Sequence, residues 1–214
     1  MLKNNKGSLL LSSILILLPI LFGLLKWNAL PAEIATHWDA LGNANGWSSR
    51  AFAVFGLPLI LLALHWVCVW GTSRDRRNAA QSRKLVQLLF WICPVVSLYA
   101  AWAVYSHALG EGMPVERLSL GLIGLLFLIF GNYFPKCRRN RTIGLRMKWT
   151  LESEENWNAT HRVCGKVWVA GGFLLILGCF LPGSLFLPLL LPLLAVLTIF
   201  PLVYSWRYHR AHRA

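Results

Sequence analysis

The stretch "SLLLSSILILLPILFGLLKW", residues 8–27, decides the class of fold. It is apolar up to Lys26 apart from its serines. A helix needs roughly 20 mostly apolar residues to cross the hydrocarbon core of a bilayer, and this stretch has that length. Lys3 and Lys6 ahead of it are also typical of a signal peptide, but no small-residue cleavage site follows. We therefore expect a retained membrane-spanning helix.

Further apolar stretches predict an all-α, polytopic membrane protein with about six transmembrane helices. The other five are residues 51–72, 85–107, 118–134, 167–181 and 184–206. Composition agrees, since hydrophobic residues make up 57% of the chain and charged residues only 14%, whereas soluble proteins carry about 25% charged residues. The mean hydropathy of +0.55 argues that the net charge of +13 marks a membrane surface and not direct nucleic-acid binding.

The basic residues predict the orientation in the membrane. With the N-terminus inside, 18 of the 21 Lys and Arg residues lie on the cytoplasmic side, and the outer side keeps only Lys26, Arg50 and Arg117. Loops rich in Lys and Arg stay in the cytoplasm. We therefore expect a multi-pass protein of the inner or plasma membrane, with both termini cytoplasmic and its surface in contact with membrane lipids.

The same pattern predicts the domain organisation. An N-terminal two-helix unit, residues 1–72, carries an extracytoplasmic loop at 28–50. A four-helix region, residues 85–214, carries a cytoplasmic loop at 135–166. We expect the two parts to form one compact membrane domain. The five cysteines show no ligand spacing, so we interpret them as core residues or free thiols and predict no metal site and no cofactor.

The cytoplasmic loop is polar although apolar stretches flank it. Its basic cluster "PKCRRNR", residues 135–141, is typical of a contact with anionic lipid, and an acidic partner is the alternative. From residue 151 the loop is expected to be helical, with Thr150 or Ser153 as the cap. Trp157, His161, Cys164 and Trp168 share one face, whereas Asn156 is expected to point elsewhere. This predicts an interfacial amphipathic helix that runs into the fifth membrane helix.

The segment "GNYFPKCRRNRTIGLRMKWTLESEENWNATHRVCGKVW", residues 131–168, resembles the signature of the SdpI family of bacterial membrane proteins. The resemblance implies protection of a cell from a secreted toxic peptide and, in some members, a transcriptional repressor held at the membrane. We expect the matching residues to form an ordered cytoplasmic surface, with Gly144 in a tight turn, and either to fold the loop or to bind a partner. They are Gly131, Asn132, Pro135, Lys136, Asn140, Gly144, Arg146, Trp149, Thr150, Leu151, Trp157, Thr160, His161, Arg162 and Gly165.

The outer loop "LPAEIATHWDALGNANGWSSR", residues 30–50, resembles a segment of unknown function often found ahead of the SdpI region. The two loop residues most able to hold a metal or a proton are His37 and Asp39, but a zinc site needs three or four ligands. We therefore expect an ordered Ω-type loop packed by Trp38 and Trp47. A ligand from outside would first meet this loop. The matching residues are Pro31, Ile34, His37, Trp38, Asp39, Gly42 and Arg50.

The resemblance to the SdpI family implies a membrane immunity or resistance protein, with a secreted peptide toxin as the outer partner and a repressor as the candidate cytoplasmic partner. A small transporter is the alternative, and it would not be ion-coupled, since no Asp, Glu, Lys or Arg lies in mid-span. An intramembrane hydrolase using His37, Asp39 or His161 is disfavoured, because the chain has no GxSxG, HExxH or paired-acid motif. We do not expect an enzyme.

Overall fold

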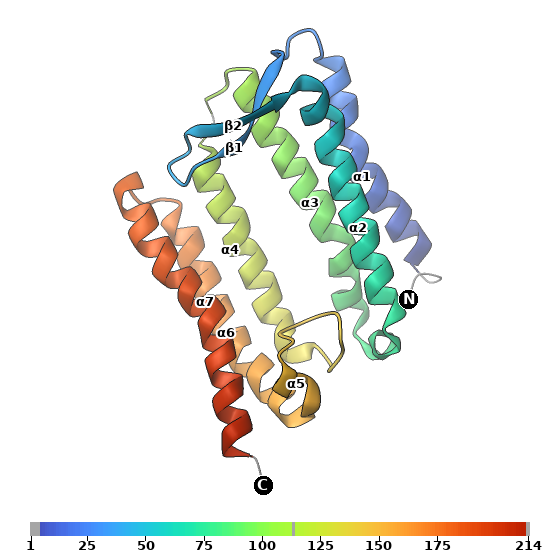
Figure 1. Cartoon of the computed structure of the whole chain (residues 1–214), viewed down its shortest axis with the longest axis vertical. Helices are drawn as coiled ribbons and strands as arrows, with labels where there is room; N and C mark the ends of the chain where they lie inside the picture. The colour runs from blue at the N-terminus through green and yellow to red at the C-terminus, as the bar shows by residue number, and fades with distance from the viewer. Residues whose placement is uncertain (1–4, 113, 213–214) are drawn as a thin grey trace. The chain divides into compact units, whose positions relative to one another are not determined.

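The computed structural model describes residues 5–112 and 114–212 (Figure 1). Within that part of the chain, five helical segments are long and apolar enough to cross a membrane: Lys6–Leu25, Phe52–Arg74, Arg83–Ala108, Val115–Lys136 and Leu185–Ala211. A two-stranded hairpin is the only sheet there. The prediction of an all-α polytopic membrane protein is confirmed. The chain divides into two compact units.

The first unit comprises Met1–Arg74 and Arg83–Val115. Its long helices, α1 (Lys6–Leu25), α2 (Leu57–Arg74) and α3 (Arg83–Ala108), run side by side. A π-helical turn, Phe52–Gly56, leads into α2. Polar side chains tie the helices together, which is how membrane helices commonly associate. The Ser97 hydroxyl donates to the Ile16 carbonyl at 2.9 Å, and the Ser12 hydroxyl lies 2.8 Å from His65 Nε2.

A β-hairpin caps the end of this unit at which α1 ends and α2 begins (Figure 1). Strands β1 (Glu33–Trp38) and β2 (Ala44–Ser49) pair antiparallel. The prediction of an Ω-type loop packed by both tryptophans was therefore wrong. Trp38 does pack, edge-on against His107 with ring centroids 5.5 Å apart, but the Trp47 side chain is 59% exposed. The hydroxyls of Thr36 and Ser48 meet across the strands at 2.9 Å, a pairing that favours a sheet.

The second unit comprises Asp75–Ser82 and Glu116–Ala214. It contains α4 (Val115–Tyr133), the short α5 (Lys148–Glu152), α6 (Glu154–Gly178) and α7 (Gly183–Ala211). Short 3-10 turns occupy Arg76–Ala80 and Phe134–Lys136. As predicted, the polar helix runs into the fifth apolar stretch, because both form the continuous helix α6. Ser153 caps it by accepting a hydrogen bond from the Asn156 amide.

Two features bring the helices of the second unit close together. On α4 and α6, Gly124 faces Gly172 and Gly131 faces Gly165, and a Cβ built on Gly131 would lie 2.7 Å from the Gly165 carbonyl oxygen. On α7, Pro201 has no N–H to offer the carbonyl four residues earlier, which belongs to Leu197. The Trp168 indole of α6 donates to that carbonyl at 2.9 Å, so a neighbouring helix satisfies the group that the proline leaves free.

Candidate functional site

The family-motif loop between α4 and α5 folds around one side chain, that of Asn140, which is fully buried. The Asn140 Oδ1 atom accepts hydrogen bonds from the amides of Thr142 at 2.8 Å and Ile143 at 2.6 Å. Its Nδ2 atom donates to the carbonyls of Arg138 at 2.8 Å and Ile143 at 2.9 Å. A buried amide with both ends bonded fixes a single loop conformation.

The loop is also held by the segment Asp75–Ser82. The Asp75 carboxylate accepts from the Arg141 amide at 2.7 Å, and the Asn78 side chain donates to the Thr142 hydroxyl at 2.7 Å. Gln81 bonds both backbone groups of Arg138, accepting from the amide at 3.0 Å and donating to the carbonyl at 2.6 Å. These three side chains were not predicted to take part in the site. The only feature of the sequence that could have pointed to them is that they lie in a polar stretch between two apolar helices.

His161 locks the next part of the motif. Because the Leu145 amide donates to Nε2 at 2.9 Å, Nε2 is an acceptor, and Nδ1 carries the proton that it donates to the Trp157 carbonyl at 2.8 Å. Burial lowers the pKa of His161 to about 4, and the hydrogen bond to the Trp157 carbonyl opposes this shift. The ring stacks on Trp157 at 4.0 Å between centroids. His161 is therefore a neutral structural group at physiological pH.

Gly144 makes this packing feasible, and its backbone conformation is one that a tight turn of the predicted kind requires. Its φ is +104°, a left-handed conformation that glycine adopts without steric cost. A Cβ at this position would also lie 2.5 Å from His161 Nε2. Beside it, the Trp157 indole donates to the Cys137 carbonyl at 2.7 Å.

Further polar contacts around the motif join α5, α6 and α7. The Trp149 indole donates to the Ser205 hydroxyl at 2.6 Å, and the Asn156 amide donates to the Ser205 carbonyl at 3.0 Å. Thr160 donates to Asn156 Oδ1 at 2.9 Å. The Thr150 hydroxyl accepts from the Met147 amide at 2.9 Å.

One expectation about this helix face needs correction. The tryptophan–histidine–cysteine face is shared as predicted, but it packs on protein, because Trp157, His161 and Cys164 are each at most 1% exposed. Asn156 is also buried, at 1% exposed, and its side chain bonds the Ser205 carbonyl of α7 and the Thr160 hydroxyl. The first turns of α6 therefore form part of the folded interior instead of lying on the membrane by an apolar face.

Part of the motif remains on the surface. Asn132, Pro135 and Arg146 are exposed, and Arg146 donates to the Arg141 carbonyl at 2.9 Å. Gly165 is buried against Gly131, as described above. Around them the second unit presents exposed cations: Arg76, Arg77, Lys136, Arg138, Arg141, Arg146, Lys148, Arg162 and Lys166. In the part of the chain that the structure describes, none of these side chains is in an ion pair.

The side chains of this loop serve to hold its fold and to present a basic surface. Burial raises the pKa of Cys137 to about 11 and that of Cys164 to about 12. Both thiols are therefore protonated at neutral pH and are poor nucleophiles. The buried amide, hydroxyl and imidazole groups are engaged with the backbone or with one another, as described above.

The outer-loop residues have separate tasks in the hairpin. The Asp39 carboxylate closes the turn by accepting from the amides of Leu41 at 2.8 Å and Asn43 at 2.9 Å, and hydrogen bonds from Asn43 lower its pKa. Gly42, with φ +84°, completes that turn. His37 instead meets the Asn45 side chain. The Pro31 carbonyl accepts from Arg50 Nε at 3.2 Å.

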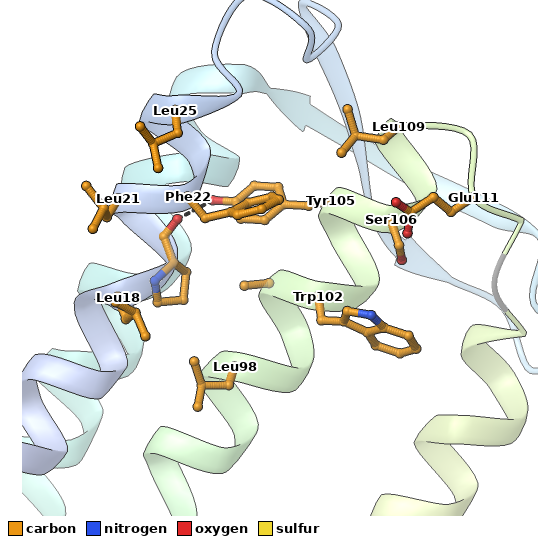
Figure 2. Close-up of a pocket in the computed structure, with 12 residues that line it drawn as sticks. Leu18, Leu21, Phe22, Leu25, Leu98, Trp102, Tyr105, Ser106, Leu109 and Glu111 are labelled. Carbon is orange, nitrogen blue, oxygen red and sulfur yellow. Dashed lines mark hydrogen bonds between the residues drawn. The ribbon is translucent and has the colours of Figure 1, made fainter.

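An apolar groove in the first unit was not identified from the sequence. It lies between α1 and α3 towards the hairpin end and has a cavity volume of about 510 Å³ (Figure 2). Its walls include Leu18, Leu21 and Phe22 from α1, and Leu98, Trp102 and Tyr105 from α3. No pattern in the sequence distinguishes such residues from those that simply face lipid. Glu111, beyond the end of α3, also lines the groove.

Together, the apolar helices, the hairpin and the folded basic loop define a polytopic membrane protein with a structured polar motif. Residues 136–205 match the SdpI/YfhL protein family, and residues 14–62 match a domain of unknown function, DUF1648. The chain is 23% identical to "Immunity protein SdpI" of Bacillus subtilis (strain 168) over 206 residues, covering 94% of this chain and 95% of that protein. No solved structure matches it. The match to the SdpI/YfhL family therefore follows the match to the segment of unknown function along the chain, in the order that the two resemblances predicted.

Proposed function

We propose that this chain is a membrane immunity protein, which protects the cell that makes it from a secreted antimicrobial peptide. The observation that carries the proposal is the similarity to the Bacillus subtilis immunity protein along nearly the full length of both chains. Such coverage favours a shared overall task more strongly than a match of the motif loop alone.

We propose further that the hairpin faces outwards and the motif loop faces the cytoplasm. The distribution of Lys and Arg supports this orientation. In it, a secreted peptide would reach the hairpin end of the first unit without crossing the bilayer. Protection would then consist of holding the peptide at that end and keeping it from the lipid.

A cytoplasmic repressor is the proposed partner of the motif loop. The buried network around Asn140 and His161 gives the loop one conformation, and the exposed cations around it are free of carboxylate partners among the described residues. A fixed basic surface suits an acidic patch on a partner protein, because complementary charge speeds and orients association. Binding of a peptide outside would have to change this surface for a signal to pass.

The test is a protection assay. A Bacillus subtilis strain that lacks its own immunity protein SdpI is made to express this chain, and is then grown with its parent strain and with peptide fractions secreted by other bacteria. We expect growth to recover against at least one of these challenges, while cells with an empty vector stay sensitive. A chain that accumulates in the membrane yet protects against none of them would contradict the proposal.

A further inference from the structure

The groove between α1 and α3 combines an apolar wall with one acidic side chain. Figure 2 shows Leu18, Leu21 and Leu25 along one helix, with Trp102 on the other. Leu21 is 55% exposed and Leu25 is 76% exposed, so protein covers neither. Glu111 lies beside Ser106 at one end of the groove (Figure 2). An apolar cleft with few, defined polar groups is typical of a binding site.

The floor of the groove is held in place before any ligand arrives. The Tyr105 hydroxyl donates to the Pro19 carbonyl at 3.1 Å, which ties α3 to α1. The Phe22 and Tyr105 rings lie 5.4 Å apart between centroids. A Cβ on Gly23 would lie 2.7 Å from the Tyr105 hydroxyl, so the absence of a side chain at Gly23 leaves room for Tyr105 to reach α1. A preformed groove lowers the ordering cost of binding.

The charge of Glu111 narrows the choice of ligand. Its side chain is exposed and, among the residues that the structure describes, it has no cationic partner, since the ion pair found there joins Arg117 and Glu116. An acyl chain would leave this carboxylate unmatched, and a lipid phosphate nearby would be repelled by it. A ligand with apolar side chains and one Lys or Arg would satisfy both features.

We propose that this groove binds an amphipathic, cationic peptide, with apolar side chains between α1 and α3 and a Lys or Arg side chain against Glu111. The inference rests on the proposed function for the biological source of the peptide, which would be the secreted toxin. It adds the place of binding and the chemical class of the ligand. Neither the hairpin turn nor the motif loop is needed to make this contact.

The binding test uses the full chain in nanodiscs of phosphatidylcholine. The probe is a fluorescent synthetic helical peptide of leucine and lysine, compared with the same peptide carrying glutamate in place of lysine, and empty nanodiscs give the background. Leu21→Trp fills the groove. Ile60→Trp is its matched control, because Ile60 is equally 55% exposed but lies on α2 outside the groove.

We expect the lysine peptide to bind above background and the glutamate peptide not to. Leu21→Trp should weaken binding about tenfold, because it removes most of the apolar contact, while Ile60→Trp binds as wild type. Glu111→Gln should weaken it about two- to fivefold, the range that an exposed ion pair supplies. Circular dichroism confirms that each variant is folded.

Three results would overturn the inference: lysine-peptide binding equal to that of empty nanodiscs, equal binding by wild type and Leu21→Trp, or equal binding of both peptides with no effect of Glu111→Gln. The last would mark a lipid site. The protection assay separates this outcome from the fate of the proposed function. If cells with Leu21→Trp are still protected, only the proposal of a peptide site in the groove is contradicted. If the peptide binds in the groove but no cell is protected, only the immunity proposal is contradicted.

Discussion

At the scale of single residues, Asn140 fixes the motif loop more than any charged side chain does. Its amide bonds backbone groups on both sides of the turn, in a place where it is fully buried. Family resemblance predicted that this residue matters, but the sequence did not indicate how. The sequence around an asparagine in a basic, polar stretch does not show whether its side chain is buried or solvated. Only the folded chain shows that its partners are Arg138, Thr142 and Ile143.

Replacing this side chain should unfold the second unit more easily. In Asn140→Ala, the amides of Thr142 and Ile143 lose their buried acceptor, and each unsatisfied group costs about 1–3 kcal/mol. We expect the free energy of unfolding to fall by about 3 kcal/mol, measured by denaturant unfolding in detergent micelles. Asn158→Ala is the matched control, because Asn158 is an exposed asparagine on α6. An equal loss in both variants would show that burial of Asn140 is not the cause.

Stability should also depend on pH through His161. Its pKa is about 4 in the folded protein and about 6.5 in an unfolded chain. The unfolded state therefore binds more protons between these values, so stability is full above pH 6.5 and falls as the pH drops towards 4. The loss from this group amounts to about 3 kcal/mol.

The measurement is the melting temperature of wild type and of His161→Gln between about pH 7.5 and about pH 4, a range that spans both pKa values. Glutamine keeps a side-chain acceptor but cannot titrate in this range. We expect the variant to be less stable at neutral pH and less sensitive to acid. A wild-type curve no steeper than that of the variant would exclude His161 as the titrating group.

At the scale of elements, the helices followed from the sequence and the hairpin did not. Runs of apolar residues with the length of a bilayer predict helices whatever their neighbours are. The hairpin depends on cross-strand partners such as Thr36 with Ser48 and on the turn at Asp39. The turn residues alone had predicted an irregular loop for this segment. For α6, periodicity predicted the shared face of Trp157 and His161 correctly, but periodicity cannot say whether protein or lipid covers a face.

The glycine contacts between α4 and α6 lead to a prediction for this pair of elements. In Gly172→Ala, the new Cβ would lie 2.7 Å from the Gly124 carbonyl oxygen, so the helices must separate. Overpacking of this kind costs about 1–3 kcal/mol, and we expect a corresponding drop in unfolding free energy. In Gly121→Ala the nearest contact is 3.4 Å from the Cys179 sulfur, and this control should behave like wild type. If both changes were equally tolerated, close α4–α6 packing would not be what stabilises the unit.

At the scale of the whole molecule, the class of protein was predictable and the groove was not. Composition and apolar length establish a polytopic membrane protein, because few charged residues remain for a water-facing surface. The groove at Leu21, Trp102 and Glu111 arises from the angle and spacing of two helices, which leave no mark on the sequence. The orientation across the membrane, on which both proposals depend, stays a prediction from the distribution of Lys and Arg.

Labelling of single introduced cysteines in intact cells tests that orientation most directly. A membrane-impermeant maleimide is applied to cells that express Asn45→Cys, in the hairpin, or Asn158→Cys, on the exposed face of α6, with wild type as the background for the native cysteines. The account predicts that the hairpin cysteine reacts in intact cells and that the α6 cysteine reacts only after lysis. Labelling of Asn158→Cys in intact cells, or protection of Asn45→Cys, would contradict an outward-facing peptide site and an inward-facing motif.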